Sequence, residues 1–144
     1  MADHENNANV GLIYQENAKI AAIFVEWRHK VLAAWFAVIS AVCAAAGWLF
    51  QQTTGRKIIC IPMLLGAAFS CIAAFLDHRN ARIMAECNRL GADLETRLLG
   101  RRAIFGFIGA THERGITYTR VLRVAYVAGA LLFLSLAIAS LCML

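Results

Sequence analysis

Charged side chains are missing from three long stretches of this sequence. Residues 31–50, 58–76 and 124–144 contain no Asp, Glu, Lys, Arg or His. Each stretch has about 20 residues, the length that an α-helix needs to cross a hydrocarbon core of ~30 Å. Lipid offers the backbone no hydrogen-bond partner, so a stretch that crosses it must be helical. The missing charge therefore argues against an ordinary soluble domain and predicts three transmembrane helices.

Proline is nearly absent as well. Pro62 is the one proline in 144 residues, so few points in the chain force a helix to end. It lies near the start of the second apolar stretch, where it fits the first turn of a helix or causes a mild kink. We therefore expect long helices, and residues 62–99 predict one about 55 Å long at ~1.5 Å per residue.

Motifs for catalysis and ligand binding are lacking too. The five cysteines form no CxxC pair and precede no histidine at metal-ligand spacing. The sequence THERG at 111–115 has the residue types of a catalytic loop, but it fits no zinc motif and is explained by a polar turn. We therefore expect no enzyme activity, no cofactor and no metal. Nucleic acid is not expected as a partner, because the basic segments lack interleaved aromatic residues.

The composition that remains is that of a membrane protein. The chain is 60% hydrophobic with a mean hydropathy of +0.62, which is high for a soluble domain. We predict an all-α integral membrane protein with three transmembrane helices, a hairpin and a C-terminal span, with amphipathic N-terminal and cytosolic helices. Its segments are 1–30 (a polar N-terminus and an amphipathic helix), 31–76 (the hairpin), 77–120 (a cytosolic helix and an interfacial segment) and 121–144 (the third span).

The first segment combines a polar end with a helical pattern. Residues 1–9 are expected to form a loose end, and Asn9 can cap the helix that follows. From about residue 10 to residue 30 the apolar residues recur at helical spacing and run into the first span without a break. Trp27 lies where an aromatic anchor at the headgroups is expected.

The basic residues predict the orientation of the chain. Of the 14 basic residues, all but Arg56 and Lys57 lie on one side of the predicted spans. The positive-inside rule then favours a cytoplasmic N-terminus and an outside C-terminus. We expect a multi-pass protein of the bacterial inner membrane.

Small residues form stripes on the first two spans. The first stripe recurs every four residues at Ala33, Ala37, Ala41 and Ala45, and the second comprises Gly66, Ser70 and Ala74. Such stripes let helix backbones approach closely, either within the hairpin or between subunits. The centres of the spans lack ionisable residues, which argues against an ion-coupled transporter. An oligomer could still line a pore with serines such as Ser40 and Ser70.

Charges flank the hairpin at its predicted inner ends. Arg28 and Lys30 precede the first span, and Asp77 and Arg79 follow the second. We expect Asp77 to pair with Arg28 or Lys30 and so to fix the depth of the hairpin.

The second span is predicted to continue as a charged cytosolic helix. A coiled-coil-like seam follows it at Asn80, Ile83, Cys87, Leu90 and Leu94. Asn80 would set register or oligomeric state on this seam, or would simply be exposed. Gly91 lies off the seam and weakens the helix a little.

The sequence GRR at 100–102 interrupts this pattern. The apolar segment 103–110 is too short to cross a bilayer. It is either an interfacial or re-entrant segment or a turn packed against neighbouring helices. Residues 111–123 are polar and are expected to begin the helix of the third span.

A helix that enters a transmembrane hairpin and leaves it as the charged segment LDHRNARIMAECNRLGADLE resembles the SLATT-type membrane effectors of bacterial defence systems. The likeness covers about residues 14–99, including Trp27-Arg28 and Asp77-His78-Arg79-Asn80. The third span departs from a plain two-span form. The resemblance implies oligomers that breach the inner membrane when a second-messenger or TIR-type sensor signals, and it implies no catalytic residues.

These observations predict an oligomeric effector that permeabilises or depolarises the bacterial inner membrane in anti-phage defence. Its partners would be the lipid bilayer, further copies of itself, and a cytosolic signalling or sensor protein or a nucleotide-type ligand. The alternative is a membrane anchor or regulatory subunit of a larger complex that conducts nothing.

Overall fold

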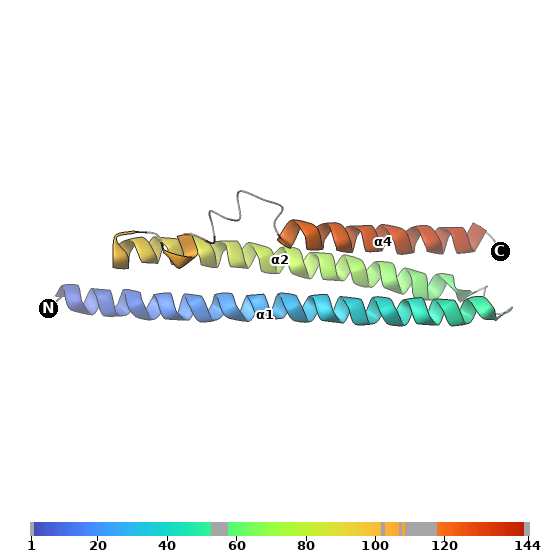
Figure 1. Cartoon of the computed structure of the whole chain (residues 1–144), viewed down its shortest axis with the longest axis horizontal. Helices are drawn as coiled ribbons and strands as arrows, with labels where there is room; N and C mark the ends of the chain where they lie inside the picture. The colour runs from blue at the N-terminus through green and yellow to red at the C-terminus, as the bar shows by residue number, and fades with distance from the viewer. Residues whose placement is uncertain (1, 53–57, 102, 107, 109–117, 143–144) are drawn as a thin grey trace. The chain divides into compact units, whose positions relative to one another are not determined.

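Three long helices make up almost all of the described chain (Figure 1). The computed structural model describes residues 2–52, 58–101, 103–106, 108 and 118–142, with side chains from Asn9 onward. The helices are α1 (Ala2–Gln51), α2 (Cys60–Leu99) and α4 (Tyr118–Cys142). Each is long and apolar enough to cross a membrane. The predicted all-α membrane fold with three candidate spans is confirmed.

Helix α1 is unbroken from the polar N-terminal region through the first apolar stretch. This confirms the predicted continuity, but the loose end expected at residues 1–9 is wrong, because the helix already begins at Ala2. No proline or glycine occurs between Ala2 and Val10, so no residue there opposes a helical backbone. Asn9 accordingly lies inside the helix and does not cap it.

Helix α2 begins two residues before Pro62 and continues through the second apolar stretch into the charged segment. Pro62 is therefore in the first turn, where its missing N–H leaves no intrahelical bond unmade. The helix ends at Leu99. Gly100 follows with φ of 66°, and its N–H donates to the carbonyl of Thr96 at 3.0 Å. A glycine adopts this left-handed conformation without strain and stops the helix there.

The internal contacts divide the chain into two units. The membrane unit comprises His29–His78 and Tyr118–Leu144. The charged unit comprises Met1–Arg28 and Arg79–Thr117.

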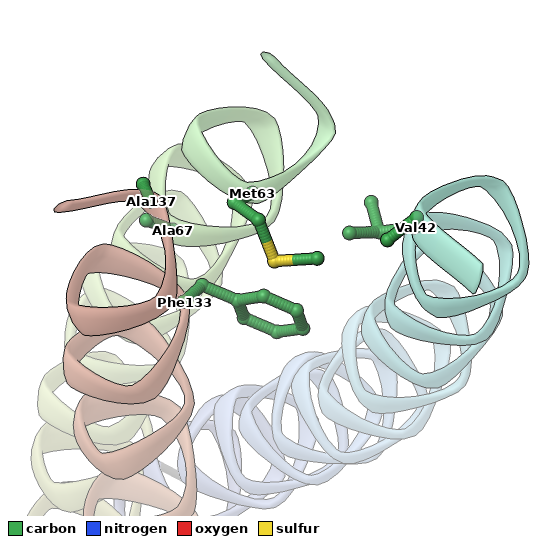
Figure 2. Close-up of a cluster of buried hydrophobic side chains, with 6 residues drawn as sticks. Val42, Met63, Ala67, Phe133 and Ala137 are labelled. Atoms are coloured by element: carbon green, nitrogen blue, oxygen red, sulfur yellow. The ribbon is translucent and has the colours of Figure 1, made fainter. Parts of the chain in front are cut away.

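The membrane unit has two buried clusters, each with side chains from α1, α2 and α4. One contains Val42, Ala46, Met63, Ala67, Phe133 and Ala137. In Figure 2, Met63 and Phe133 point into the space between the three helices, toward Val42. A Cβ atom on Gly66 would lie 3.1 Å from the ring of Phe133, so the small residue lets α4 approach α2. The other cluster contains Trp35, Ala73, Leu122 and Tyr126.

The charged unit has a smaller core. Its buried members are Ala21, Cys87 and Phe105, from α1, α2 and the segment after α2. Residues 104–106 form a helical turn, and Phe105 is buried. Of the interpretations open for residues 103–110, the described part agrees with a turn packed against neighbouring helices. Residues 107, 109 and 110 lie outside the described part.

Candidate functional site

A polar contact joins the helices inside the membrane unit. Trp35 of α1 donates from Nε1 to Ser70 Oγ of α2 at 3.0 Å, and both side chains are buried. The ring of Tyr126 from α4 meets the Trp35 ring edge-on, with centroids 5.2 Å apart and planes at 84°. Edge-on aromatic pairs add to the stability that burial provides. One indole therefore contacts both other helices.

Gly129 makes this approach of α4 possible. A Cβ atom there would lie 3.0 Å from Cζ2 of Trp35 and 3.4 Å from Ser70 Oγ. Any larger residue would push the indole away from its serine partner. We name Trp35, Ser70, Tyr126 and Gly129 the indole junction.

We predict that Ser70→Ala costs about 1–2 kcal/mol of stability, because the buried Trp35 N–H loses its acceptor. Unfolding in mixed micelles measures the loss, and a double-mutant cycle with Trp35→Phe isolates the pair. Ser135→Ala is the matched control, because the exposed Ser135 hydroxyl donates to the Leu131 carbonyl of its own helix at 2.8 Å. Equal effects at positions 70 and 135 would contradict the assignment.

At the start of α4, two further contacts hold the membrane unit. Arg123 Nη2 lies 3.0 Å from His78 Nδ1 of α2. Arginine can only donate, so this nitrogen of His78 accepts and the imidazole is neutral in the contact. The ring of Tyr118 lies 6.3 Å from that of His29 of α1. These side chains link α4 to both other helices.

The charged unit is organised around the carboxylate of Glu95, which is fully buried. Oε2 accepts hydrogen bonds from the backbone N–H groups of Ala103 at 2.7 Å and Gly106 at 3.2 Å. Oε1 accepts from the N–H of Phe105 at 2.9 Å and from the hydroxyl of Tyr14 at 3.2 Å. The carboxylate therefore ties the turn after α2 to α1.

Phe105 fills a notch in α2 at Gly91. A Cβ atom on Gly91 would lie 2.4 Å from Cγ of Phe105, so the position has room only for glycine. Tyr14 of α1 packs edge-on against the same ring, with centroids 5.5 Å apart and planes at 89°. Asn17 of α1 also donates from Nδ2 to the carbonyl of Cys87 at 2.8 Å. We call Tyr14, Gly91, Glu95 and Phe105 the carboxylate clamp.

The protonation states of the clamp follow from these contacts. Burial acts to raise the pKa of Glu95, but the N–H groups of Phe105, Ala103 and Gly106 and the Tyr14 hydroxyl outweigh it and hold the pKa below its usual value. Burial first, and then the hydrogen bond to Glu95 and its charge, raise the pKa of Tyr14. Burial raises the pKa of the Cys87 thiol. Near neutral pH the clamp therefore holds a charged carboxylate and a neutral phenol.

We predict that acid loosens the charged unit. The unfolded carboxyl titrates near ~4.3. A lowered folded pKa therefore means that Glu95 stabilises fully above that pH and loses the contribution as the pH falls through the folded value. Pepsin cleavage near Phe105, measured against an unfolded substrate, should rise as the pH drops below about 4. The same pH dependence in Glu95→Gln would refute this assignment.

The predicted stripes differ in where they lie. On α1, Ala33, Ala37, Ser40, Ala41 and Ala45 are all exposed. On α2, Gly66 and Ser70 are buried and Ala74 is half-buried. The two stripes do not meet within the chain, because α1 turns Trp35, Val42 and Ala46 inward instead.

The predicted charges and the predicted seam are also split. Arg28 and Asp77 are buried, whereas Lys30 and Arg79 are exposed. The pairing of Asp77 with Arg28 or Lys30 stays a prediction. On the seam, Cys87 and Leu94 are buried, Asn80 and Ile83 are half-buried, and Leu90 is 46% exposed.

The residues that organise both units were not singled out by the sequence. Trp35 and Gly129 look like ordinary members of an apolar helix, and Glu95 looks like a surface acid on a charged one. A glycine in the middle of a helix is unfavourable on its own, so Gly91 and Gly129 carried the one usable signal, that of a close approach.

Neither site has the composition of a reaction centre. Within the described ranges, no group of three or more His, Cys, Asp or Glu residues could hold a metal ion. The THERG sequence at 111–115 lies outside the described residues. Comparisons with protein-family models, curated proteins and solved structures found no match to this chain. The three candidate spans make it a multi-pass membrane protein.

Proposed function

We propose that this protein is a non-enzymatic, homo-oligomeric effector of the bacterial inner membrane, which permeabilises or depolarises the bilayer when signalled. The signal would come from a cytosolic sensor protein or a nucleotide-type ligand that acts on the charged unit, in anti-phage defence. The resemblance to SLATT-type effectors over residues 14–99 supports this class.

The exposed alanine face of α1 is the observation that carries the proposal. Ala33, Ala37, Ala41 and Ala45 point away from the rest of the chain, while the small residues of α2 are used inside it. Helices associate in lipid through small residues that permit close backbone contact. A face of this kind, left unused by its own chain, favours self-association.

The basic residues support the orientation that the proposal needs. Within the charged unit, Lys19, Arg82, Arg89 and Arg97 lie on exposed positions. The positive-inside rule would place this unit in the cytoplasm, where a sensor or a ligand could reach it.

A non-conducting anchor is the second candidate, and the burial of Ser70 favours it. Ser70 is fully buried and bonded to Trp35, so it faces no pore axis in this conformation. Ser40 is exposed on the alanine face and remains a candidate to line one. In this second function the protein would hold a soluble partner at the membrane.

Membrane integrity after induced expression separates the two functions. A potential-sensitive dye with propidium uptake should show rapid depolarisation for the native chain, and its loss when Ala37 and Ala41 are changed to Leu. Ala128→Leu with Ala139→Leu is the matched control, because both alanines are exposed on α4. An intact membrane with the native chain, even when a soluble protein co-purifies with it, would support the anchor instead.

A further inference from the structure

One face of α1 carries a heptad seam that runs through nearly the whole helix. From Ile13 to Trp48, positions at alternating steps of three and four residues are all exposed. They are Ile13, Glu16, Ile20, Ile23, Trp27, Lys30, Ala34, Ala37, Ala41, Ala44 and Trp48. All but Glu16 and Lys30 are apolar. This is the spacing by which one helix supercoils around another.

The chain's own packing leaves this seam uncovered. Helix α1 turns a different face inward, with Asn17 and Ala21 buried in the charged unit and Trp35, Val42 and Ala46 buried in the membrane unit. Along the seam, Ile13 is 50% exposed, Ile20 44%, Ile23 51% and Trp27 55%. Large apolar side chains spaced in this way indicate an interaction surface.

Lipid covers only the later part of the seam. At ~1.5 Å per residue, Ile13 lies about 25 Å along α1 from Lys30, where the apolar stretch begins. The headgroup layer adds only about 5–7 Å to each side of the hydrocarbon core. Ile13 and Ile20 thus lie beyond the bilayer in a helix that crosses it at an ordinary tilt, and they would face water without a protein partner.

We propose that the occupant of the seam is α1 of a second copy, parallel and in register. Copies inserted in the same orientation can meet only in parallel, so bulky residues before position 30 face bulky residues, and alanines face alanines. The alanines permit close contact in lipid, and the isoleucines fill the wider aqueous part. The inference rests on the self-association in the proposed function and assigns its surface.

The charge on the seam is compatible with this pairing. Two Glu16 side chains would approach each other, but each is bridged by Lys19 of its own helix, with Nζ and Oε1 2.6 Å apart. A polar residue at one seam position fixes register in coiled coils at some cost in stability. Glu16 would do so here.

Cysteine crosslinking in native membranes tests the register. In a chain with its five cysteines replaced by alanine, a single cysteine at Ile20 or Ala37 should crosslink to the same residue of a second copy. The matched controls are cysteines at Ala22 and Phe36, which are exposed but off the seam. We expect at least about fivefold more dimer at the seam positions. Equal dimer at both kinds of position would overturn the assignment.

A second measurement uses the chain with its native cysteines. Ile13→Glu with Ile20→Glu should lower the oligomer mass measured by light scattering in detergent, whereas Gln15→Glu with Ala22→Glu should not. Oligomers that resist the seam variants would overturn the inference even if the membrane still depolarises. Crosslinking along the seam in cells that keep their membrane potential would uphold the inference and defeat the proposed permeabilisation.

Discussion

Replacing Glu95 with alanine is expected to release the turn at 103–106 and to destabilise the charged unit by about 3–5 kcal/mol. Three backbone N–H groups and the Tyr14 hydroxyl would lose their acceptor at a site from which water is excluded. Amide hydrogen exchange followed by mass spectrometry measures this directly. Protection of the peptide that contains Phe105 should fall toward that of an unstructured chain.

Glu86→Ala is the control for this experiment. Glu86 lies on the same helix and pairs with Arg89 at 3.1 Å, but both side chains are more than 70% exposed. Ion pairs of this kind contribute little in water, so exchange near Phe105 should not change. Retained protection at Phe105 in Glu95→Ala would show that the aromatic contacts alone hold the turn.

Gly91→Ala is expected to destabilise the charged unit by about 2–3 kcal/mol, although alanine favours helices. The added methyl group would overlap Cγ of Phe105, and the ring could move only by drawing its N–H away from Glu95. Thermal unfolding of the detergent-solubilised protein measures the loss. The same technique should show that Phe105→Ala abolishes most of the added cost.

Gly11 supplies the opposite sign. It also lies inside a helix, but nothing lies within 4 Å of the Cβ position there. Gly11→Ala should therefore stabilise α1 by about 0.5–1 kcal/mol through helix propensity alone. If the two substitutions shifted the melting temperature in the same direction, the steric role of Gly91 would be wrong.

The membrane helices could be predicted from sequence because the signal lies in one dimension. A run of about 20 uncharged residues is enough to specify a span, and the lack of proline allowed α1 and α2 to continue beyond their spans. The N-terminal boundary failed for the same reason in reverse, since polar residues such as Asn6 and Asn7 suggested a loose end although they do not stop a helix.

The packing inside the spans could not be predicted in this way. Every face of a span is apolar, so hydrophobic periodicity does not distinguish the face toward lipid from the face toward a neighbour. The alanines of α1 were the more conspicuous pattern, yet Trp35 and Val42 are the residues that pack inward. The role of Trp35 depends on Ser70 and Gly129, which come from other helices and are distant in sequence.

The charged unit shows the same limit with a different residue. Glu95 lies among other charged residues in a helix that looks solvated, and an acid in that position is usually exposed. Its burial depends on Phe105 and on the backbone N–H groups of a turn that lies beyond the end of the helix. Local sequence does not contain that information.

The contacts between α1 and α2 also fix how many residues each helix must contain. Asn17 and Trp35 are 18 residues apart, or five whole turns, so both lie on the same side of α1. Their partners on α2, Cys87 and Ser70, are 17 residues apart. Inserting or deleting one residue between such a pair would rotate one contact by about 100° relative to the other. Genetic drift in this chain should therefore proceed by substitution within α1 and α2, because a change of length there would break one contact whenever it preserved the other.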